Sequence, residues 1–357
     1  MTRVAILGGG SWGTALAIVL SRSPRAHEIS LWVHDAALAA SVRRERENQA
    51  YLPGHRVPES VNVTSSLGES VASATIIVGA MPAAFARSVY TQALRYLEAA
   101  PRSPSSETEP SKTFVSATKG LEPSTHLRMS EVIAQVISPK FSPLVAVLSG
   151  PSFAAEVAGS EPTAVVVASQ GMAGRWEGNM RRYDQLAGKL QEEFASPGFR
   201  LYTNDDVLGV ELAGAMKNVM AIAAGACQGL GLGWNSLAAL VTRGLAEMTR
   251  LAVALGARPE TLSGLAGLGD LVLTCTGSLS RNRQVGIELG KGRPISEILA
   301  GMRMVAEGVG TAAALLALAG EAGIEMPITE QVEAIVHQGK SPREAIRNIM
   351  DRPQKRE

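Results

Sequence analysis

The 357-residue sequence predicts an α/β domain at the N-terminus, followed by an all-α domain. Two patterns lead to this prediction. Over the first ~200 residues, short apolar runs alternate with stretches of helical length, which is typical of βαβ units with parallel strands. After Leu201 the strand-like runs stop, and Ala, Gly and Leu recur at helical spacing to the end of the chain.

Six short apolar runs are the expected strands of the first domain. They cover residues 3–7, 28–33, 74–81, 113–118, 144–150 and 163–169. Two polar segments separate some of these runs. We expect the Pro- and Ser-rich segment 100–112 to form a surface loop, and the segment 170–189 to form an exposed helix or loop.

The boundary between the domains is expected near Leu201. Thr203 or Asn204 can cap the first helix of the second domain, because Asp205 and Asp206 would then lie favourably in its first turn. The chain is thereby divided into an α/β domain, an all-helical domain and a charged tail, at residues 1–201, 202–345 and 346–357.

A glycine-rich turn follows the first expected strand, in the stretch "VAILGGGSWGTALAIVL". Gly8, Gly10 and Gly13 have the G-x-G-x-x-G spacing. Glycine allows a tight turn and a close approach to a ligand, and the free N–H groups at the start of the helix attract a diphosphate. The turn predicts a dinucleotide site in a doubly wound, Rossmann-like domain; the alternative is a turn with a purely structural role.

Composition excludes several classes of protein. The net charge is +1, and no basic stripe with interleaved aromatic residues is present, so we expect no nucleic-acid partner. Cys227 and Cys275 are the only cysteines, too few for a disulfide framework, which favours a reducing cytoplasm. The N-terminus has the pattern of a strand and not of a signal peptide.

One span without charged residues, from Val219 to Val241, is long enough for a membrane helix. It contains Gln228, Asn235 and the helix-breaking run from Gly229 to Gly233. We therefore expect two buried helices joined by a glycine-rich turn, and no membrane insertion.

Cofactor selectivity depends on the residues after the second strand. Asp35 could bind the ribose hydroxyls of NAD, as an acid does in many such domains. His34 could instead face the 2′-phosphate of NADP, and the alternative is that both are ordinary polar loop residues. We favour a site that accepts NADPH.

Lys119 follows an expected strand, where ligands of open α/β sheets bind, although a lone lysine is commonly a surface residue. Gly150 and Ser152 also follow a strand and could admit a ligand or form an ordinary turn. Lys217 interrupts an apolar helix with small neighbours, so it is either a buried acid/base with a lowered pKa or a lysine that extends to solvent.

The stretch "GLAGLGDLVLTCTGSLSRNRQVG" is the most unusual in the chain. Asp270 is isolated among apolar residues, so it is a core acid or a site acid. Ser280, Arg281 and Asn282 precede a helix, where a hydroxyl, a guanidinium and an amide make a good anion site. The alternative is that Ser280 or Asn282 only caps that helix.

Long motifs extend this interpretation. The stretches "GGGSWGTALA", "SATKG", "LSGPSFAAE", "GVELAGAMKNVMAIAAGACQGLGLGWN" and "VAEGVGTA", with the stretch around Asp270, resemble the bacterial-type NAD(P)-dependent glycerol-3-phosphate dehydrogenases. The resemblance runs from Val4 to about Val336. It implies reversible reduction of dihydroxyacetone phosphate by NADPH or NADH to sn-glycerol 3-phosphate, which supplies glycerophospholipid synthesis.

The resemblance also implies a role for single residues. Lys217 matches the general acid/base, with Lys119 and Asp270 as further catalytic residues. Substrate contacts match Lys119, Gly150, Ser152, Lys217, Asp270, Ser280, Arg281 and Asn282. Cofactor contacts match the glycine turn at Gly8, Gly10 and Gly13 with Ser11, Trp12, His34, Tyr51, Lys119, Ala154, Arg281, Val305 and Glu307. No metal is implied.

Two alternatives to this function remain at the level of sequence. One is a related two-domain dehydrogenase for another hydroxy acid or sugar acid, and the other is a non-catalytic NAD(H)-binding sensor. The partner expected is a small phosphate substrate. The sequence does not determine the oligomeric state, for which a homodimer through the helical domain is the hypothesis.

Overall fold

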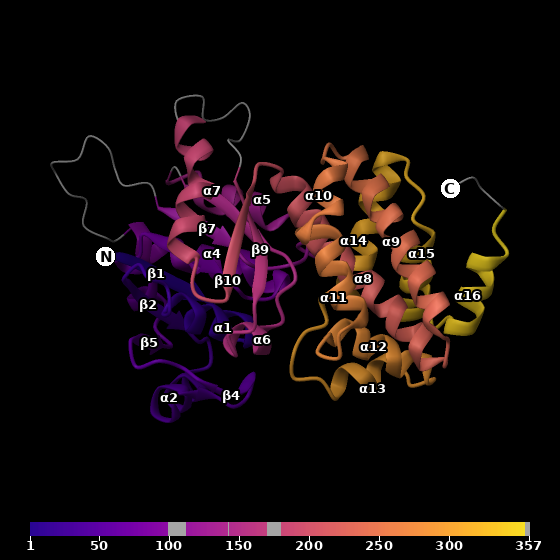
Figure 1. Ribbon diagram of the computed structural model, residues 1–357, viewed down its shortest axis with the longest axis horizontal. Helices are drawn as coiled ribbons and strands as arrows, with labels where there is room; N and C mark the ends of the chain where they lie inside the picture. Colours follow the sequence, from indigo (N-terminus) through magenta and orange to yellow (C-terminus); the bar gives the residue numbers. More distant parts are fainter. Residues whose placement is uncertain (99–111, 142, 170–179, 354–357) are drawn as a thin grey trace. The chain divides into compact units, whose positions relative to one another are not determined.

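The computed structural model describes residues 1–98, 112–141, 143–169 and 180–353. The chain forms two compact units (Figure 1). Unit 1 comprises Met1–Thr118 and Leu127–Val207, and unit 2 comprises Lys119–His126 and Leu208–Glu357. The predicted loop over 100–112, apart from Lys112, lies outside the described residues. So does the stretch 170–179 of the second predicted polar segment.

Unit 1 is built on a sheet with eight strands in the described part of the chain. Its order is β10-β9-β8-β7-β6-β1-β2-β5. The strands are β1 (Thr2–Leu7), β2 (His27–Trp32), β5 (Val61–Thr64), β6 (Ile76–Gly79), β7 (Thr113–Ser116), β8 (Leu144–Ser149), β9 (Thr163–Ser169) and β10 (Phe199–Asn204). All six strands expected from the sequence are present.

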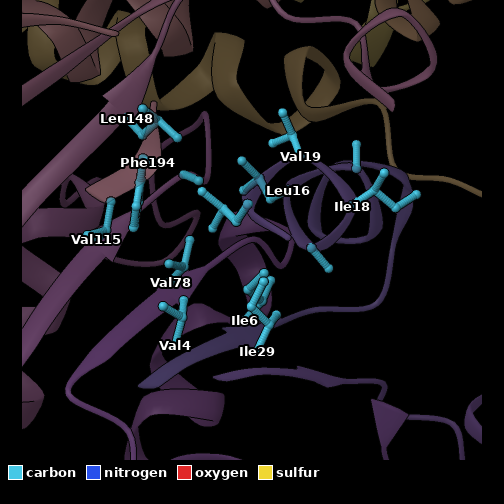
Figure 2. Close-up of a cluster of buried hydrophobic side chains, with 14 of the residues drawn as sticks. Val4, Ile6, Leu16, Ile18, Val19, Ile29, Val78, Val115, Leu148 and Phe194 are labelled. Carbon is cyan, nitrogen blue, oxygen red and sulfur yellow. The ribbon is translucent and has the colours of Figure 1, made fainter. Parts of the chain in front are cut away.

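Helices cover both faces of this sheet because its strands are apolar on both sides. Val4 and Ile6 of β1 belong to one buried cluster, whereas Ala5 and Leu7 belong to another on the opposite face. Figure 2 shows the first cluster, in which Leu16 of the first helix packs near side chains of the strands. The helices are α1 (Ser11–Leu20), α2 (Ala36–Glu45), α3 (Leu67–Ala72), α4 (Ala83–Glu98), α5 (Met129–Ile137), α6 (Ala154–Ala158) and α7 (Met180–Phe194).

The expectation of parallel strands throughout is wrong at one pair. Strand β9 runs antiparallel to β8, whereas the other neighbouring pairs of the sheet are parallel. The connection from β8 to β9 holds the short helix α6, which packs against α1, and the chain then returns in the opposite direction.

Four strands of the structure are not among those predicted from the sequence. Strand β5 forms one edge of the sheet and β10 the other, while β3 (Glu47–Asn48) and β4 (Leu52–Arg56) form a separate small hairpin. Because β10 contains Thr203 and Asn204, neither residue caps the next helix. The strand ends three residues after the predicted boundary at 201, and the Asn204 side chain accepts the N–H of Asp206. Helix α8 begins only at Val207, so Asp205 and Asp206 precede its first turn.

Unit 2 is helical in its described residues. Its helices are α8 (Val207–Gly229), α9 (Trp234–Ala254), α10 (Pro259–Ser263), α11 (Asp270–Thr276), α12 (Arg281–Gly290), α13 (Ile295–Ala300), α14 (Glu307–Ala322), α15 (Pro327–His337) and α16 (Pro342–Met350), with a π-helical turn, η2 (Leu265–Gly269). Helix α16 extends into the segment that we expected to be a charged tail.

Helix α8 is the core of unit 2. It is the one helix among the described residues that is long and apolar enough to cross a membrane, but 78% of its apolar window is buried inside the protein. Helix α9 begins at Trp234 after the glycine-rich turn, as the sequence predicts, but the expectation that it is buried there is wrong: Trp234 is 80% exposed, and no residue of α9 before Gly244 is buried. Burial by its neighbours therefore explains the apolar composition of α8, with no need for lipid.

Glycines bring α8 and α12 into backbone contact. A Cβ atom on Gly225 would lie 2.0 Å from the carbonyl oxygen of Arg283, and one on Gly286 would lie 2.0 Å from that of Ile222. Such distances are far below van der Waals contact, so only glycine fits at either position. This close packing fixes the start of α12 beside the middle of α8, where Lys217 lies.

The segment Lys119–His126 joins the helical unit although its flanking residues belong to unit 1. Leu121 anchors it, since its side chain is buried in the hydrophobic cluster of unit 2. The segment thereby carries Lys119 into the helical unit.

Candidate active site

Lys217 lies in the middle of α8 with its ammonium buried inside unit 2. The side chain is 6% exposed, so it does not extend to solvent. Its Nζ atom donates to Asp270 Oδ1 at 2.8 Å and to Thr274 Oγ1 at 2.8 Å. The other carboxylate oxygen of Asp270 lies 2.7 Å from Lys119 Nζ. A single buried carboxylate therefore bridges two ammonium groups, as Asp270 is only 1% exposed.

Burial and charge tune this cluster. Burial lowers the pKa of Lys217 from its ordinary value of 10.5 to about 8; the Asp270 charge opposes this change and the Lys119 charge reinforces it. Burial alone would raise the pKa of Asp270, but the two ammonium groups outweigh it and hold that pKa below its ordinary value. The result is a lysine that can exchange a proton near neutral pH.

Thr274 completes the surroundings of Lys217. It lies one helical turn after Asp270 on α11, and its hydroxyl donates to the backbone carbonyl of Asp270 at 2.6 Å. The oxygen is then oriented to accept a hydrogen from Lys217. Its spacing of four residues from Asp270 is the sequence signal that could have identified it.

A second buried polar group adjoins the lysine. Asn218 follows Lys217 on α8 and accepts a hydrogen bond from Asn282 Nδ2 at 3.0 Å. The side-chain oxygen of Asn282, Oδ1, accepts a hydrogen bond from the backbone N–H of Gly308 at 3.0 Å. Asn282 thus links α8, α12 and the start of α14, and it does not cap its own helix α12.

Ser280 has the structural role that the sequence left open. It is the N-cap of α12, and its Oγ accepts the N–H of Arg283 at 3.2 Å. Arg281 follows as the first helical residue and is exposed, and it interacts electrostatically with Glu307. Glu307 is the first residue of α14, and Val305 shortly before it is 45% exposed. These residues converge because Asn282 bonds the start of α14.

The three glycines of the motif in unit 1 have different surroundings. Gly8 has φ +123°, and a Cβ there would lie 2.8 Å from the backbone of Ala80. A Cβ on Gly13 would lie 1.9 Å from the carbonyl oxygen of Gly8, so Gly13 lets α1 pack against β1. A Cβ on Gly10 would meet nothing within 4 Å. Gly10 therefore borders open space at the N-terminus of α1.

The residues around this turn fit a dinucleotide. Gly10 is the N-cap of α1, so the turn lies at the positive end of the helix dipole. The buried Nε1 of Trp12 has no hydrogen-bond partner within the described residues. Open space, helix N–H groups and an unsatisfied indole N–H together suit a phosphate-containing ligand.

His34 and Asp35 follow β2, whose neighbour in the sheet is β1. The Asp35 carboxylate is the N-cap of α2 and accepts the N–H of Leu38 at 2.7 Å. His34 is exposed and stacks edge-on against Trp32, with ring centroids 5.6 Å apart. Tyr51 lies half-buried between β3 and β4. The acid is therefore engaged with a helix, whereas the imidazole is accessible.

Gly150, Ser152 and Ala154 lie together in unit 1, after β8. Gly150 has φ +129°, and the Ser152 hydroxyl donates to its carbonyl at 2.9 Å. Ala154 begins α6, which packs against α1. The structure thus groups the predicted residues of unit 1 around the ends of strands, and those of unit 2 around Lys217 and the start of α12.

Comparison with known proteins decides the family. Family models described as NAD-dependent glycerol-3-phosphate dehydrogenase N-terminus and C-terminus match residues 3–174 and 206–347. The chain belongs to this family. It is 52% identical to the glycerol-3-phosphate dehydrogenase [NAD(P)+] of Koribacter versatilis, covering 99% of this chain and 98% of that protein. The enzyme of the same name from Acidobacterium capsulatum is 51% identical, with 99% of both chains covered.

A solved structure supports the same assignment. The crystal structure of glycerol-3-phosphate dehydrogenase from Coxiella burnetii has a TM-score of 0.86 and 38% identity, covering 98% of this chain and 99% of that one. The protein is accordingly an NAD(P)-dependent oxidoreductase with a Rossmann-like domain and a helical domain. It reduces dihydroxyacetone phosphate to glycerol 3-phosphate, and the hydroxy-acid and sensor alternatives fall away.

Proposed function

We propose that Lys217 is the general acid/base of the reversible reduction of dihydroxyacetone phosphate to sn-glycerol 3-phosphate. The observation that carries this proposal is the buried ammonium of Lys217, with a pKa of about 8, held by Asp270 and Thr274. When bound, the nicotinamide cofactor supplies the hydride that reaches the ketone carbon. Lys217 then donates its proton to the ketone oxygen, and the reverse reaction returns the proton to the lysine.

Asp270 and Lys119 support that proton transfer. Asp270 holds the Lys217 ammonium at 2.8 Å, and with both lysines protonated the three groups carry a net charge of +1. A surplus positive charge away from water stabilises the negative charge that develops on the reacting oxygen. We assign Lys119 to contacts with both substrate and cofactor, as the family resemblance implies.

The phosphate of the substrate is assigned to the start of α12. Ser280, Arg281 and Asn282 provide a hydroxyl, a guanidinium and an amide at a helix N-terminus, where the helix dipole favours an anion. Asn282 contacts Asn218, the residue after Lys217, so the phosphate and the ketone of one small molecule can be held in neighbouring places. Gly150 and Ser152 are assigned as further substrate contacts.

The cofactor is assigned to the glycine turn of unit 1. Gly8, Gly10, Ser11, Trp12 and Gly13 form this turn and the start of α1, and the open space at Gly10 supports the assignment. The remaining proposed contacts are His34, Tyr51, Lys119, Ala154, Arg281, Val305 and Glu307. We further propose that the enzyme is cytoplasmic and that it supplies glycerol 3-phosphate to phospholipid synthesis. We also propose that it forms a homodimer through the helical unit.

Replacing the lysine tests this function directly. Lys217→Ala should lower kcat by at least ~100-fold and leave the Kd for NADPH unchanged, because general acid/base catalysis contributes roughly 10²–10⁴-fold. Lys291→Ala is the matched control, since Lys291 is an exposed lysine of the same unit, paired with Glu288. A Lys217→Ala enzyme that turns over within a few-fold of the wild type would exclude the assigned role.

A further inference from the structure

Asn48, at the end of β3, is a buried amide in unit 1 for which the proposed reaction has no role. It is 0% exposed, and all of its side-chain polar groups are engaged. Its Nδ2 donates to the carbonyl oxygen of Gly9 at 2.9 Å and to Thr14 Oγ1 at 2.9 Å. Its Oδ1 accepts the backbone N–H of Tyr51 at 3.3 Å.

These bonds hold the glycine turn from both ends. Gly9 lies within the turn, and Thr14 is in the first turn of α1, where its N–H bonds the Gly10 carbonyl at 3.0 Å. The third bond connects the turn to Tyr51, a residue of the small hairpin. Asn48 therefore ties the turn at Gly9 and the first turn of α1 at Thr14 to the small hairpin at Tyr51.

The bond to Gly9 also sets a direction. In a planar trans peptide the carbonyl and the following N–H point in opposite directions. Because the Gly9 carbonyl is held toward Asn48, the Gly10 N–H is held away from it. A fixed N–H beside open space at a helix N-terminus is a preorganised donor for an anion.

We propose that Asn48 is a positioning residue for the dinucleotide, fixing the Gly9–Gly10 peptide so that its N–H faces the diphosphate. The inference rests on the proposed function, in which the glycine turn binds the cofactor. Asn48 itself acts through the turn and touches no reacting atom. Its loss should weaken cofactor binding and leave the chemical step intact.

The test compares binding with turnover. Asn48→Ala should raise the Kd for NADPH, measured by its fluorescence, by about 10-fold, equivalent to about 1.4 kcal/mol. The kcat at saturating NADPH should remain within about 3-fold of the wild type, and the KM for dihydroxyacetone phosphate should not change. In the ligand-free protein, the amide resonance of Gly10 should shift or broaden as its peptide loses its fixed direction.

Two further variants guard against a simple loss of folding. Asn48→Asp keeps the shape of the side chain but has at most one hydrogen to donate, against the two of the amide, so its NADPH Kd should also rise. Thr14→Val keeps the volume of a buried side chain and removes one acceptor, so it should fold and raise the Kd by about 3-fold.

A matched control and a separate variant decide between explanations. Gln191→Ala removes an amide that bonds the Leu201 carbonyl at the far edge of the sheet, and it should leave the NADPH Kd unchanged. Gly10→Ala fits the fold but fills the open space, so it should weaken NADPH binding if the turn is the cofactor site. An unchanged Kd in Gly10→Ala would overturn the proposed site itself. Gly10→Ala could bind NADPH more weakly while Asn48→Ala, Asn48→Asp and Thr14→Val all keep the wild-type affinity. That result would overturn only the role of Asn48.

Discussion

Lys217 and Asp270 lie 53 residues apart in the sequence, yet their side chains meet at 2.8 Å inside unit 2. The carboxylate also holds Lys119 at 2.7 Å. A buried acid that bridges the buried Lys217 and the half-buried Lys119 must be kept ionised, since an uncompensated charge in that place would be costly. Burial lowers the pKa of Lys217, and the Asp270 carboxylate opposes that change. The first two predictions follow from these two effects.

The pH dependence of the reaction should follow the pKa of Lys217, about 8. Reduction requires the protonated lysine, so its kcat/KM should be constant below this value and fall tenfold per pH unit above it. Oxidation requires the neutral lysine, so its kcat/KM should rise with pH and level off above about 8. Measurements should start near pH 7, where a phosphate monoester is already largely dianionic.

Lys217→Arg provides the control for this profile. A guanidinium stays protonated up to a pKa above ~12, so the variant should show no change of activity centred near pH 8. If the wild-type kcat/KM is flat from pH 7 to 9 in both directions, Lys217 is not the titrating acid/base.

Asp270→Asn should shift the pH profile downward and destabilise the protein. Removing the carboxylate removes the charge that raises the pKa of Lys217, so the midpoint should fall below that of the wild type. Breaking a buried ion pair should lower the free energy of unfolding by about 3–5 kcal/mol, measured by urea denaturation. Glu288→Gln, which removes a half-buried surface acid paired with Lys291 and Arg293, should change neither property. A variant with an unaltered midpoint would show that Asp270 does not set the charge on Lys217.

Ser280→Ala should raise the KM for dihydroxyacetone phosphate, in addition to weakening α12. Loss of an N-cap costs about 1 kcal/mol of stability. Ser341→Ala is the matched control, because Ser341 caps α16 with the same bond to the N–H three residues later and lies outside the proposed site. Both variants should unfold more easily, but only Ser280→Ala should bind substrate less well. If the two variants have the same KM for dihydroxyacetone phosphate, Ser280 serves only as a helix cap.

Asn282→Ala should have a larger effect on the substrate. Losing a charge-assisted hydrogen bond costs roughly 1.5–3 kcal/mol, or about 10- to 150-fold in affinity. The KM for dihydroxyacetone phosphate should rise by that factor, while the Kd for NADPH should change little. Arg281→Ala should weaken both ligands. A folded Asn282→Ala enzyme with wild-type KM would assign Asn282 to the Asn218–Gly308 link alone.

NADPH should be used at least as well as NADH. The Asp35 carboxylate caps α2, so we expect it to point away from the place where the 2′-phosphate of NADPH would bind. His34→Ala should lower kcat/KM for NADPH by about 3- to 10-fold, equivalent to about 1 kcal/mol, and leave that for NADH nearly unchanged. The control is His337→Ala, on α15 of the other unit. A clear preference for NADH that His34→Ala does not alter would refute the role of this histidine.

The sequence by itself determined the features that depend on local pattern. Apolar runs and their spacing predicted the six main strands, the helical second half and the glycine turn, because side-chain periodicity reports how a single element is buried. The same patterns marked Lys217 and Asp270 as polar residues in apolar surroundings. They left open whether Lys217 is buried and whether Asn282 caps a helix.

Only the tertiary structure decided those questions, because the answers depend on residues far apart in the chain. Lys217 is buried because Asp270 and Thr274 accept its hydrogens, and Asn282 is held by Asn218 on another helix. The direction of β9 depended likewise on how its short connection packs. Asn48 illustrates the same limit: in the sequence it is one polar residue among others, and only folding brings it against Gly9, 39 residues away. Such pairings depend on how whole elements pack against one another. The periodicity within one element carries no information about that packing.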